Sequence, residues 1–291
     1  MIKKNIGSIS VISTPIGNSD DITIRAIKTL NEIDFIACED TRMTSKLCRI
    51  HKINYKGKLI SYHDHNSDKA MPLIFNKLIN GFNVAIVTDA GTPLISDPGY
   101  KLIKKALDND IIVKSVPGPS ALTAAMSISG ISSDQFMFLG FLPRKASLRK
   151  KKIASLINQN CSIVIFESAI RIHKALLELY ELLGNRNISI VREITKLYEE
   201  NIRGNLSDII DLLKSKKLKG EIVILIEKPD VSQNIYTDED LINMLKKLLP
   251  QLGASRASKE ISKNTSIKSD YKKIHCLRIL TLEKEILSFF S

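Results

Sequence analysis

The sequence predicts an α/β protein built from two α/β domains and a small helical C-terminal extension. Short apolar runs alternate with helical segments over about the first 230 residues, which is typical of parallel sheets covered by helices. The rigid turn Pro117-Gly118-Pro119 interrupts this alternation, and only helical patterns follow the polar stretch near Asp230. We therefore expect an N-terminal domain at 1–117, a second domain at 118–230 and the extension at 235–291.

Each element of the first domain has its own signal. Apolar runs predict the strands, and the all-apolar run 84–87 is typical of a buried parallel strand. The strands are expected at 9–13, 33–38, 84–87 and 111–116, and the helices at about 23–31, at about 71–80 and after Pro98-Gly99.

The second domain repeats the pattern. A helix is expected from about 170 to 183, because Gly184 is a good C-terminal cap. In the extension, Ala257 and Ile261 are four residues apart, which indicates one face of a helix in a helix-turn-helix-like bundle. The other strands are expected at 136–139, 162–166, 188–191 and 221–226, and the other helices at 121–126, 241–249, 255–262 and 268–277.

Composition limits the class of protein. With 291 residues, 44% of them hydrophobic, the chain can bury a core and form two domains. No apolar run approaches the ~20 residues of a membrane span, and no signal-peptide core follows Lys3 and Lys4. The cysteines form no CxxC pair, which argues against a zinc site or disulfide framework: Cys38, Cys48, Cys161 and Cys276. We expect a cytoplasmic protein without membrane contact.

The formal net charge of +12 has two interpretations. It favours a polyanionic partner such as nucleic acid, or it reflects the abundance of Ile, Lys and Asn that AT-rich coding produces. Residues 251–280 carry seven Lys or Arg against two Asp or Glu, which suits RNA contact but also a dimerisation or capping module. The densest basic run is either a solvated helix start or a phosphate contact, and contains Arg144, Lys145, Arg149, Lys150, Lys151 and Lys152.

The acidic, glycine-rich turn at 88–99 is the strongest signal of a pocket. It follows the 84–87 strand, and ligands of α/β sheets bind beyond the carboxyl ends of strands. Asp89 lies at this end, and Gly91 lets a ligand approach the backbone closely. The alternative is an ordinary tight turn. Neither GxGxxG nor GxxxxGK[ST] is present, which argues against NAD, FAD and P-loop enzymes.

Three further polar corners have a structural and a functional interpretation. Residues 39–42 form either a helix-capping cluster or a catalytic group. Ser120-Ala121 opens a helix of small residues, which either packs closely or leaves room for a ligand. His63-Asp64-His65 lacks a third spaced metal ligand, and is either a surface pair or, by the resemblance given below, a border of the cleft.

Seven motifs in order give the chain a specific resemblance. Together they resemble the ribosomal RNA small subunit methyltransferase I family, a branch of the tetrapyrrole methylase superfamily. The motifs are Pro15-Ile16-Gly17-Asn18, Glu39-Asp40-Thr41-Arg42, Ser61-Tyr62-His63-Asp64-His65-Asn66, 89–99, Pro117-Gly118-Pro119-Ser120-Ala121, Gly140-Phe141-Leu142-Pro143 and Arg192-Glu193-Ile194-Thr195-Lys196. The resemblance implies two α/β domains with S-adenosylmethionine in the cleft between them, a small C-terminal extension and a homodimer. It also implies methylation of the ribose 2′-hydroxyl of a decoding-region cytidine in 16S rRNA, within the small ribosomal subunit.

The resemblance also assigns residues. Carboxylates and carbonyl oxygens suit the cationic end of S-adenosylmethionine. Glu39, Asp40 or Lys196 are candidates for accepting the ribose proton, and Arg42 for holding a phosphate. Ala169-Ile170 replaces the Pro-His pair usual in the family, so any role of that histidine is not carried over. The residues expected to line the cofactor pocket are Pro15, Asp89, Ala90, Gly91, Thr92, Ser120 and Ala121, with Phe166 and the region around Glu221 as weaker candidates.

Two alternatives stay open at this point. A methyltransferase of the same superfamily acting on a tetrapyrrole would make the basic segments incidental. A non-enzymatic RNA-binding ribosome-assembly factor would have kept the fold without the activity. Intact Asp89, Gly91 and Ser120 argue against the second alternative.

Overall fold

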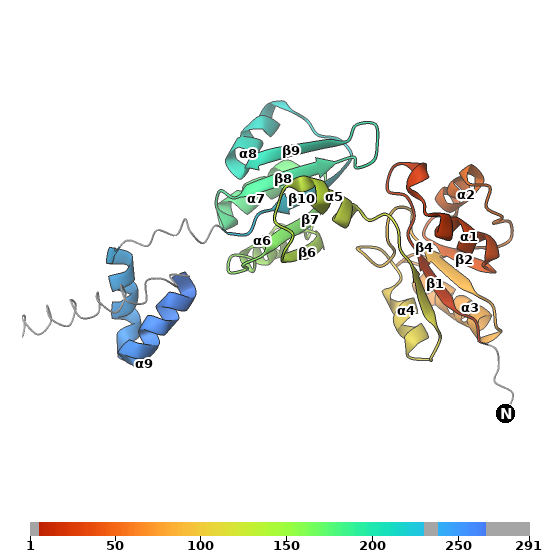
Figure 1. The fold of residues 1–291 in the computed structure, drawn as a ribbon, viewed down its shortest axis with the longest axis horizontal. Helices are drawn as coiled ribbons and strands as arrows, with labels where there is room; N and C mark the ends of the chain where they lie inside the picture. Colours follow the sequence, from red (N-terminus) through yellow and green to blue (C-terminus); the bar gives the residue numbers. More distant parts are fainter. Residues whose placement is uncertain (1–5, 230–237, 266–291) are drawn as a thin grey trace, which may run out of the picture. The chain divides into compact units, whose positions relative to one another are not determined.

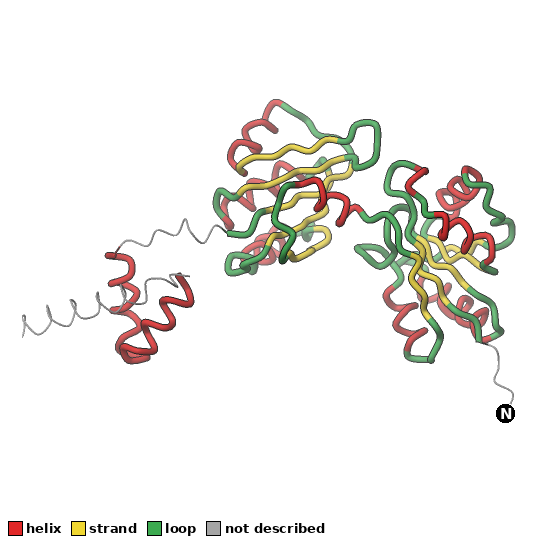
Figure 2. Tube along the Cα trace, in the orientation of Figure 1, coloured by secondary structure: helices red, strands yellow, loops and turns green. Residues whose placement is uncertain are grey.

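A computed structural model describes residues 6–229 and 238–265 of the chain. Its contacts divide the chain into two compact units, 1–228 and 229–291. The first unit contains two five-stranded sheets, each flanked by helices (Figures 1 and 2). None of the described helices is both long and apolar enough to span a bilayer.

The first sheet is entirely parallel, with strand order β3-β2-β4-β1-β5. The central strand β4 is buried at all four positions, as its unbroken apolar run predicts. Thr23 caps the first helix by accepting a hydrogen bond from the Ala26 N–H (3.1 Å). The bounds are β1 Ile9–Ile12, α1 Ile24–Glu32, β2 Phe35–Cys38, α2 Thr41–Ile50, β3 Leu59–Ser61, α3 Ser67–Ile79, β4 Val84–Val87, α4 Tyr100–Leu107 and β5 Val113–Val116.

Helices cover both faces of this sheet. Ala26 and Leu30 of α1 and Cys48 of α2 pack in one buried cluster. Residues of α3 and α4, including Ile74 and Leu102, pack in the cluster on the other face. The carboxyl edge of the sheet is therefore left to its loops, which is where ligands of such sheets bind.

The second sheet is mixed, with strand order β6-β7-β10-β8-β9. Only the β6–β7 pair is parallel, and the other three pairs are antiparallel. One face packs against α6, α7 and α8, and the other packs against α5. The bounds are α5 Ala121–Ser129, β6 Phe136–Phe141, α6 Ala146–Ala154, β7 Ser162–Ser168, α7 Ile172–Leu183, β8 Asn187–Arg192, β9 Glu200–Asn205, α8 Leu206–Ser215 and β10 Glu221–Ile226.

The second unit contains α9 (Asp238–Thr265), which is two helices broken at Gly253 (φ 67°). Ala257 and Ile261 share a buried cluster with Leu241 and Leu245, in keeping with their helical spacing. The expected helix at 268–277 lies outside the described residues, as does Cys276.

The predicted α/β class is confirmed, but no residue range was predicted for several elements, including a 3-10 helix at Ser19–Asp21 and α6. The edge strands β3 and β9 are short or polar, so their sequences lack the apolar run of a central strand. The helices α2 and α8 were also not assigned, although α8 buries Leu206, Ile209, Ile210 and Leu213 on one face.

The three cysteines in the described residues are free, and that part of the chain has no group of side chains suited to a metal ion.

Candidate functional site

The loops after β1, β4 and β5 are joined at the carboxyl edge of the first sheet. Thr14 and Gly91 exchange two backbone hydrogen bonds, of 2.9 and 3.1 Å, and the Thr14 hydroxyl donates to the Thr88 carbonyl (3.0 Å). The Thr92 hydroxyl lies 2.9 Å from that of Ser13 and donates to the Pro119 carbonyl (3.0 Å). Three loops distant in sequence therefore form one fixed rim.

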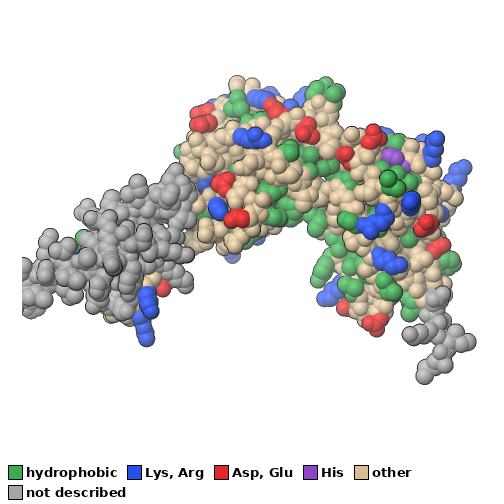
Figure 3. Space-filling model, in the orientation of Figure 1, with side chains coloured by type: hydrophobic (Ala, Val, Ile, Leu, Met, Phe, Trp, Pro, Cys, Tyr) green, Lys and Arg blue, Asp and Glu red, His purple; other side chains and the backbone are tan. Residues whose placement is uncertain are grey.

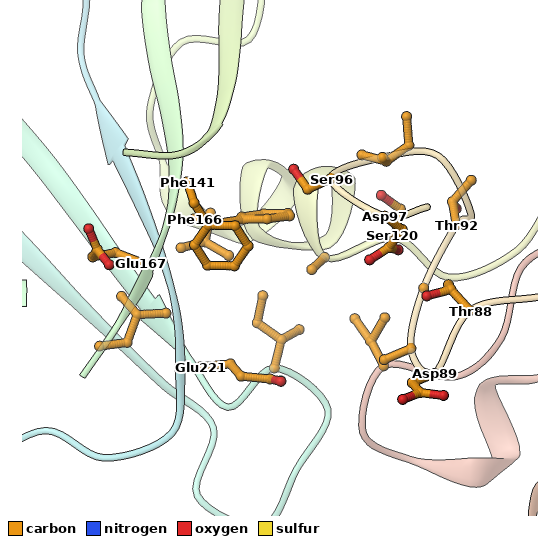
Figure 4. Close-up of a pocket in the computed structure, with 18 of the residues that line it drawn as sticks. Thr88, Asp89, Thr92, Ser96, Asp97, Ser120, Phe141, Phe166, Glu167 and Glu221 are labelled. Atoms are coloured by element: carbon orange, nitrogen blue, oxygen red, sulfur yellow. The ribbon is translucent and has the colours of Figure 1, made fainter. Parts of the chain in front are cut away.

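A cavity of about 340 Å³ opens at this rim, which is within the usual size range for ligand sites. Its walls come from the 88–97 loop, the start of α5, and the second-sheet segments around Phe166, Ile194 and Glu221. Figure 4 shows Thr88, Asp97 and Ser120 on one side of the cavity and the rings of Phe141 and Phe166 on the other.

The cavity lining is acidic although the chain is basic. It includes five acids and, among the described residues, no Lys or Arg. Burial raises the pKa of Asp97 to about 6, and the charges of Glu39 and Asp89 add to the shift while hydrogen bonding to Thr88 opposes it. Burial also raises the pKa of Asp89. Glu167 pairs with Arg171 (3.2 Å) and Glu221 with Lys196 (2.9 Å), so the repulsion is between the first-sheet carboxylates, and a positive charge beside them would relieve it. The five are Glu39, Asp89, Asp97, Glu167 and Glu221.

Two acids of the rim are held by hydrogen bonds. The Thr88 hydroxyl donates to Glu39 Oε2 (3.0 Å), and Asp89 Oδ1 accepts from the Asp40 N–H (3.1 Å). The loops after β2 and β4 are therefore connected by hydrogen bonds between their polar groups.

The opposite wall is aromatic. Phe166 makes edge-to-face contacts with Phe138 (centroids 4.8 Å apart) and with Phe141 (5.8 Å). Phe141 is 58% exposed, so a ligand or substrate can reach its ring. The cavity thus offers Asp89 and Asp97 on the side of the first sheet, and flat apolar rings on the side of the second sheet, where Glu167 and Glu221 also lie (Figure 4).

Strained backbone is concentrated at the cavity. Leu94 (φ 74°) and Ser96 (φ 66°) adopt left-handed conformations in the β4 loop. Glu193 (φ 50°) and Thr195 (φ 65°) do so in the loop after β8. Non-glycine residues rarely adopt this conformation, and such strain often marks functional sites.

The strained loop after β8 is fixed by contacts with the β1 loop of the first α/β half. Thr195 Oγ1 accepts from the Asn18 N–H (3.0 Å). A Cβ on Gly17 would lie 2.8 Å from the Ile194 carbonyl oxygen, so this close approach requires glycine. The β1 loop therefore packs directly against the loop after β8.

The structure places most of the predicted cofactor residues around this cavity. Pro15 is the exception, because Ile16 lines the cavity in its place. Ser120 occupies the N-cap position of α5, but its side chain makes no capping hydrogen bond, contrary to the expectation. The predicted residues that line the cavity are Glu39, Asp89, Ala90, Gly91, Thr92, Ser120, Ala121, Phe166 and Glu221.

Asp40 and Arg42 do not line the cavity. Asp40 caps α2 by accepting from the Arg42 N–H (2.8 Å), and its carboxylate pairs with the Arg42 guanidinium (2.6 Å). Hydrogen bonds from Arg42 lower the pKa of Asp40 to about 2, which makes it a poor proton acceptor. Of the two interpretations of residues 39–42, the structure therefore supports helix capping for Asp40.

Lys196 lies behind the cavity wall rather than in it. Its ammonium pairs with Glu193 (3.0 Å) and Glu221 (2.9 Å). Burial works to lower the pKa of Lys196, but the hydrogen bonds to the two carboxylates outweigh it and raise the pKa. Lys196 is therefore positively charged near neutral pH, which argues against its expected role as a proton acceptor.

The basic run on α6 is not uniformly a phosphate surface. Arg149 is buried at 4% exposure and makes two hydrogen bonds to Glu178, of 2.5 and 2.8 Å, so its expected contact with RNA is wrong. Lys150 is exposed and pairs with Glu181 (2.9 Å). Lys145 and Lys151 are exposed, as are Arg144 and Lys152. On the face drawn in Figure 3, Lys and Arg lie among Asp and Glu rather than in one continuous patch.

Sequence reasoning did not assign a role to Asp97 or Phe141, which line the cavity. Asp97 belongs to the same 88–99 turn that predicts the pocket, so the signal was present. Phe141 belongs to the Gly140-Phe141-Leu142-Pro143 motif. A Cβ on Gly140 would lie 2.8 Å from Ser96 Oγ, which shows how closely this segment approaches the β4 loop.

Comparison with known proteins defines the class. A family model described as Tetrapyrrole (Corrin/Porphyrin) Methylases matches residues 8–210. A cobalt precorrin-4 methyltransferase of cobalamin biosynthesis has the same fold, with a TM-score of 0.54 at 18% identity, over 76% of this chain and 94% of that one. The structure of uroporphyrin III C-methyl transferase from Thermus thermophilus matches with a TM-score of 0.54 at 16% identity. This match covers 75% of this chain and 97% of that one. The chain is therefore a methyltransferase of the tetrapyrrole methylase class.

Sequence relatives narrow this class to one family. A Thermotoga maritima protein is 45% identical over 76% of this chain and 98% of its own length. A Rickettsia prowazekii protein is 41% identical over 86% of this chain and 87% of its own length. A Bacillus subtilis protein is 40% identical over 82% of this chain and 80% of its own length. All three are named Ribosomal RNA small subunit methyltransferase I. The chain belongs to the ribosomal RNA small subunit methyltransferase I family.

Proposed function

We propose that this protein transfers a methyl group from S-adenosylmethionine to the ribose 2′-hydroxyl of a decoding-region cytidine in 16S rRNA. One observation carries the proposal: a carboxylate-lined cavity lies within a protein of net charge +12. The cavity suits a cationic methyl donor, and the basic exterior suits a polyanionic substrate. The names of the relatives support rRNA as that substrate. We place the reaction in the cytoplasm, on the small ribosomal subunit, by a homodimer.

The residues of the cavity fit the donor in charge and in shape. S-adenosylmethionine supplies an electrophilic methyl group on a sulfonium cation. Asp89 and the backbone of Ala90-Gly91-Thr92 would hold its cationic end, because carboxylates and carbonyl oxygens favour positive charge. Phe166 offers a flat apolar surface for the adenine ring.

Asp97 is the best-placed proton acceptor for the ribose hydroxyl. It lines the cavity together with Glu39, and a carboxylate with a pKa of about 6 is mostly deprotonated at neutral pH while still basic enough to accept a proton. Glu39 is the second candidate, since the Thr88 hydroxyl donates to it within the same cavity. The exposed Arg42 is proposed to hold a phosphate next to the reacting ribose.

The wider RNA contact is assigned to exposed basic residues outside the cavity. Lys150 is included, although it shares its charge with Glu181. The extension at 235–291 is proposed to add affinity through its excess of Lys and Arg. The other residues of α6 and its preceding turn are Arg144, Lys145, Lys151 and Lys152.

Replacing Asp89 by Asn is expected to weaken S-adenosylmethionine binding about tenfold or more. The substitution keeps the shape of the side chain but removes the charge, and hydrogen bonds to charged groups contribute roughly 1.5–3 kcal/mol. Isothermal titration calorimetry measures the change. Asp108→Asn, an exposed acid at the end of α4, is the matched control and should bind as the wild type does. Equal affinity in both variants would remove Asp89 from the site.

The substrate is tested by incubating the protein with methyl-labelled S-adenosylmethionine and undermethylated small ribosomal subunits. We expect label in 16S rRNA at a 2′-O-methyl cytidine, mapped by its resistance to alkaline hydrolysis. Label in a precorrin-type tetrapyrrole and none in RNA would favour the tetrapyrrole alternative. Failure to bind S-adenosylmethionine would favour a non-enzymatic assembly factor.

A further inference from the structure

A second cavity, of about 450 Å³, lies beside the acidic one in the second α/β half. Its walls come from two segments, the turn 169–173 that leads into α7 and the loop 216–220 that joins α8 to β10. We call residues 216–220 the lysine loop, because three of its five residues are Lys216, Lys217 and Lys219.

The charge of this second cavity is opposite to that of the first. Its lining contains the three lysines and His173 and, among the described residues, no Asp or Glu. Lys216 pairs with Glu200. Lys217 and Lys219 are exposed and form no ion pair within the described part of the chain. Two uncompensated ammonium groups are therefore available to an anion.

An apolar surface lies within this basic rim. Ile170 is 96% exposed, while Ile172 and Leu218 are buried beneath the cavity. An exposed β-branched side chain surrounded by cations suits a ligand that is apolar on one face and anionic along its edge. A polynucleotide has this character, since its sugar and base faces alternate with phosphates.

The two cavities share a wall. Gly220 lines both, and the adjacent Glu221 lines the acidic one. Gly220 has φ +88°, and a Cβ there would overlap the carboxylate of Glu193, so the close approach of that carboxylate requires glycine. Glu193 accepts from the Glu221 N–H (3.0 Å) and pairs with Lys196. The lysine loop is therefore fixed against the wall of the catalytic cavity.

We propose that the lysine loop and Ile170 form a subsite for the RNA strand flanking the methylated nucleotide, with phosphates on Lys217 and Lys219. The inference rests on the proposed rRNA methylation and adds the surface that aligns the strand. Lys217 and Lys219 line the second cavity and form no ion pair with the described residues, whereas Arg149 of α6 is buried and Lys150 is paired with Glu181.

The first test replaces both unpaired lysines, as Lys217→Ala/Lys219→Ala, in the full-length protein. The KM for undermethylated small ribosomal subunits should rise roughly tenfold, and the slope of log affinity against log salt should decrease by about 1.4, or ~0.7 for each phosphate contact to a single strand. The affinity for S-adenosylmethionine should not change. Lys28→Ala/Lys104→Ala removes the same charge from exposed lysines that line neither cavity, and should leave KM and slope near their wild-type values.

The second test exploits the exposure of Ile170, where a polar side chain does not threaten folding. Ile170→Glu and Ile170→Lys remove the same apolar contact but introduce opposite charges. The Glu variant should raise the KM for the subunits at least tenfold. The Lys variant should raise it by a factor of three at most, because its new charge offsets the lost contact.

The outcomes separate this subsite from the proposed function. Methylation of RNA by all variants with unchanged KM and salt slope overturns the subsite and leaves the proposed function intact. Equal increases in KM for Ile170→Glu and Ile170→Lys also overturn it, since they would show that the charge at this position does not affect RNA binding. A wild-type protein that binds the donor but labels no RNA contradicts both.

Discussion

An Asp97→Asn variant is expected to lose about 100-fold or more in kcat, the lower end of the range for general acid–base catalysis. Asn keeps the size of the side chain but cannot accept the ribose proton. Single-turnover methylation at saturating donor and subunits measures the loss. Glu39→Gln is the matched comparison, since Glu39 lines the same cavity and accepts from Thr88. A larger loss for Glu39→Gln would transfer the proton-accepting role to Glu39.

The pH profile distinguishes a proton acceptor from a residue that only shapes the cavity. In the wild type, kcat/KM for S-adenosylmethionine should fall below about pH 6, because Asp97 is then protonated in the free enzyme. In Asp97→Asn the residual activity should lack this limb. If kcat/KM fell at low pH with the same midpoint in both proteins, the titrating group would be a residue other than Asp97.

The same substitution should stabilise the fold at neutral pH. The pKa of Asp97 is raised from 3.8 to about 6, so the native state binds more protons than the unfolded chain between these values. The free energy of unfolding therefore falls as pH rises through about 6, and the repulsive cost is fully present above it. Because Asp97 is partly exposed, solvent screens this repulsion, and Asp97→Asn is expected to gain roughly 1 kcal/mol at pH 7.5. Urea denaturation at pH 4.5 and 7.5 should show a clearly larger gain at the higher pH, because the cost develops between pH 3.8 and about 6.

Replacing Arg149 by Met is expected to lower the free energy of unfolding by about 3–5 kcal/mol. The Arg149 guanidinium makes two hydrogen bonds to Glu178, and its Nη1 also donates to the Arg144 carbonyl (2.9 Å). Both side chains are less than 10% exposed, so Met would leave a buried carboxylate without its partner. Chemical denaturation measures the loss, and Lys151→Met, an exposed position on the same helix, should change stability by less than about 0.5 kcal/mol.

A double replacement separates this explanation from lost packing. Arg149→Met/Glu178→Met removes both charges, so it should recover most of the stability that Arg149→Met loses. A double variant as unstable as the single one would contradict a charge-based cost. If the Arg149→Met variant were stable but bound RNA more weakly, the result would support the phosphate contact that the sequence suggested for Arg149.

The sequence predicted the fold well where local signals agree with burial. The run Val84–Val87 is apolar throughout and is the central strand of a parallel sheet, so periodicity and tertiary position coincide. The edge strand Glu200–Asn205 has a polar sequence, and it is a strand because it pairs with β8 rather than because of an apolar run of its own. Edge strands of this kind become predictable only when the neighbouring strand is known.

The location of the site in one loop could be predicted from the sequence, but the ion pairs of its charged residues could not. The turn 88–99 identified the pocket because acids and glycines after a buried strand have a direct physical meaning. Arg149 was misjudged because its partner Glu178 is 29 residues away in sequence, and Lys196 because Glu221, one of its two partners, is 25 residues away. Whether a basic side chain is free, paired or buried depends on such contacts, which composition does not contain.

A crystal structure of the protein with S-adenosylmethionine would test most directly whether the acidic cavity is the methyl-donor site. We expect the donor in the cavity lined by Asp89, Asp97 and Phe166, with its cationic end towards the carboxylates and its adenine towards the phenylalanine. Donor density outside this cavity, or against the lysine loop, would contradict the proposed site.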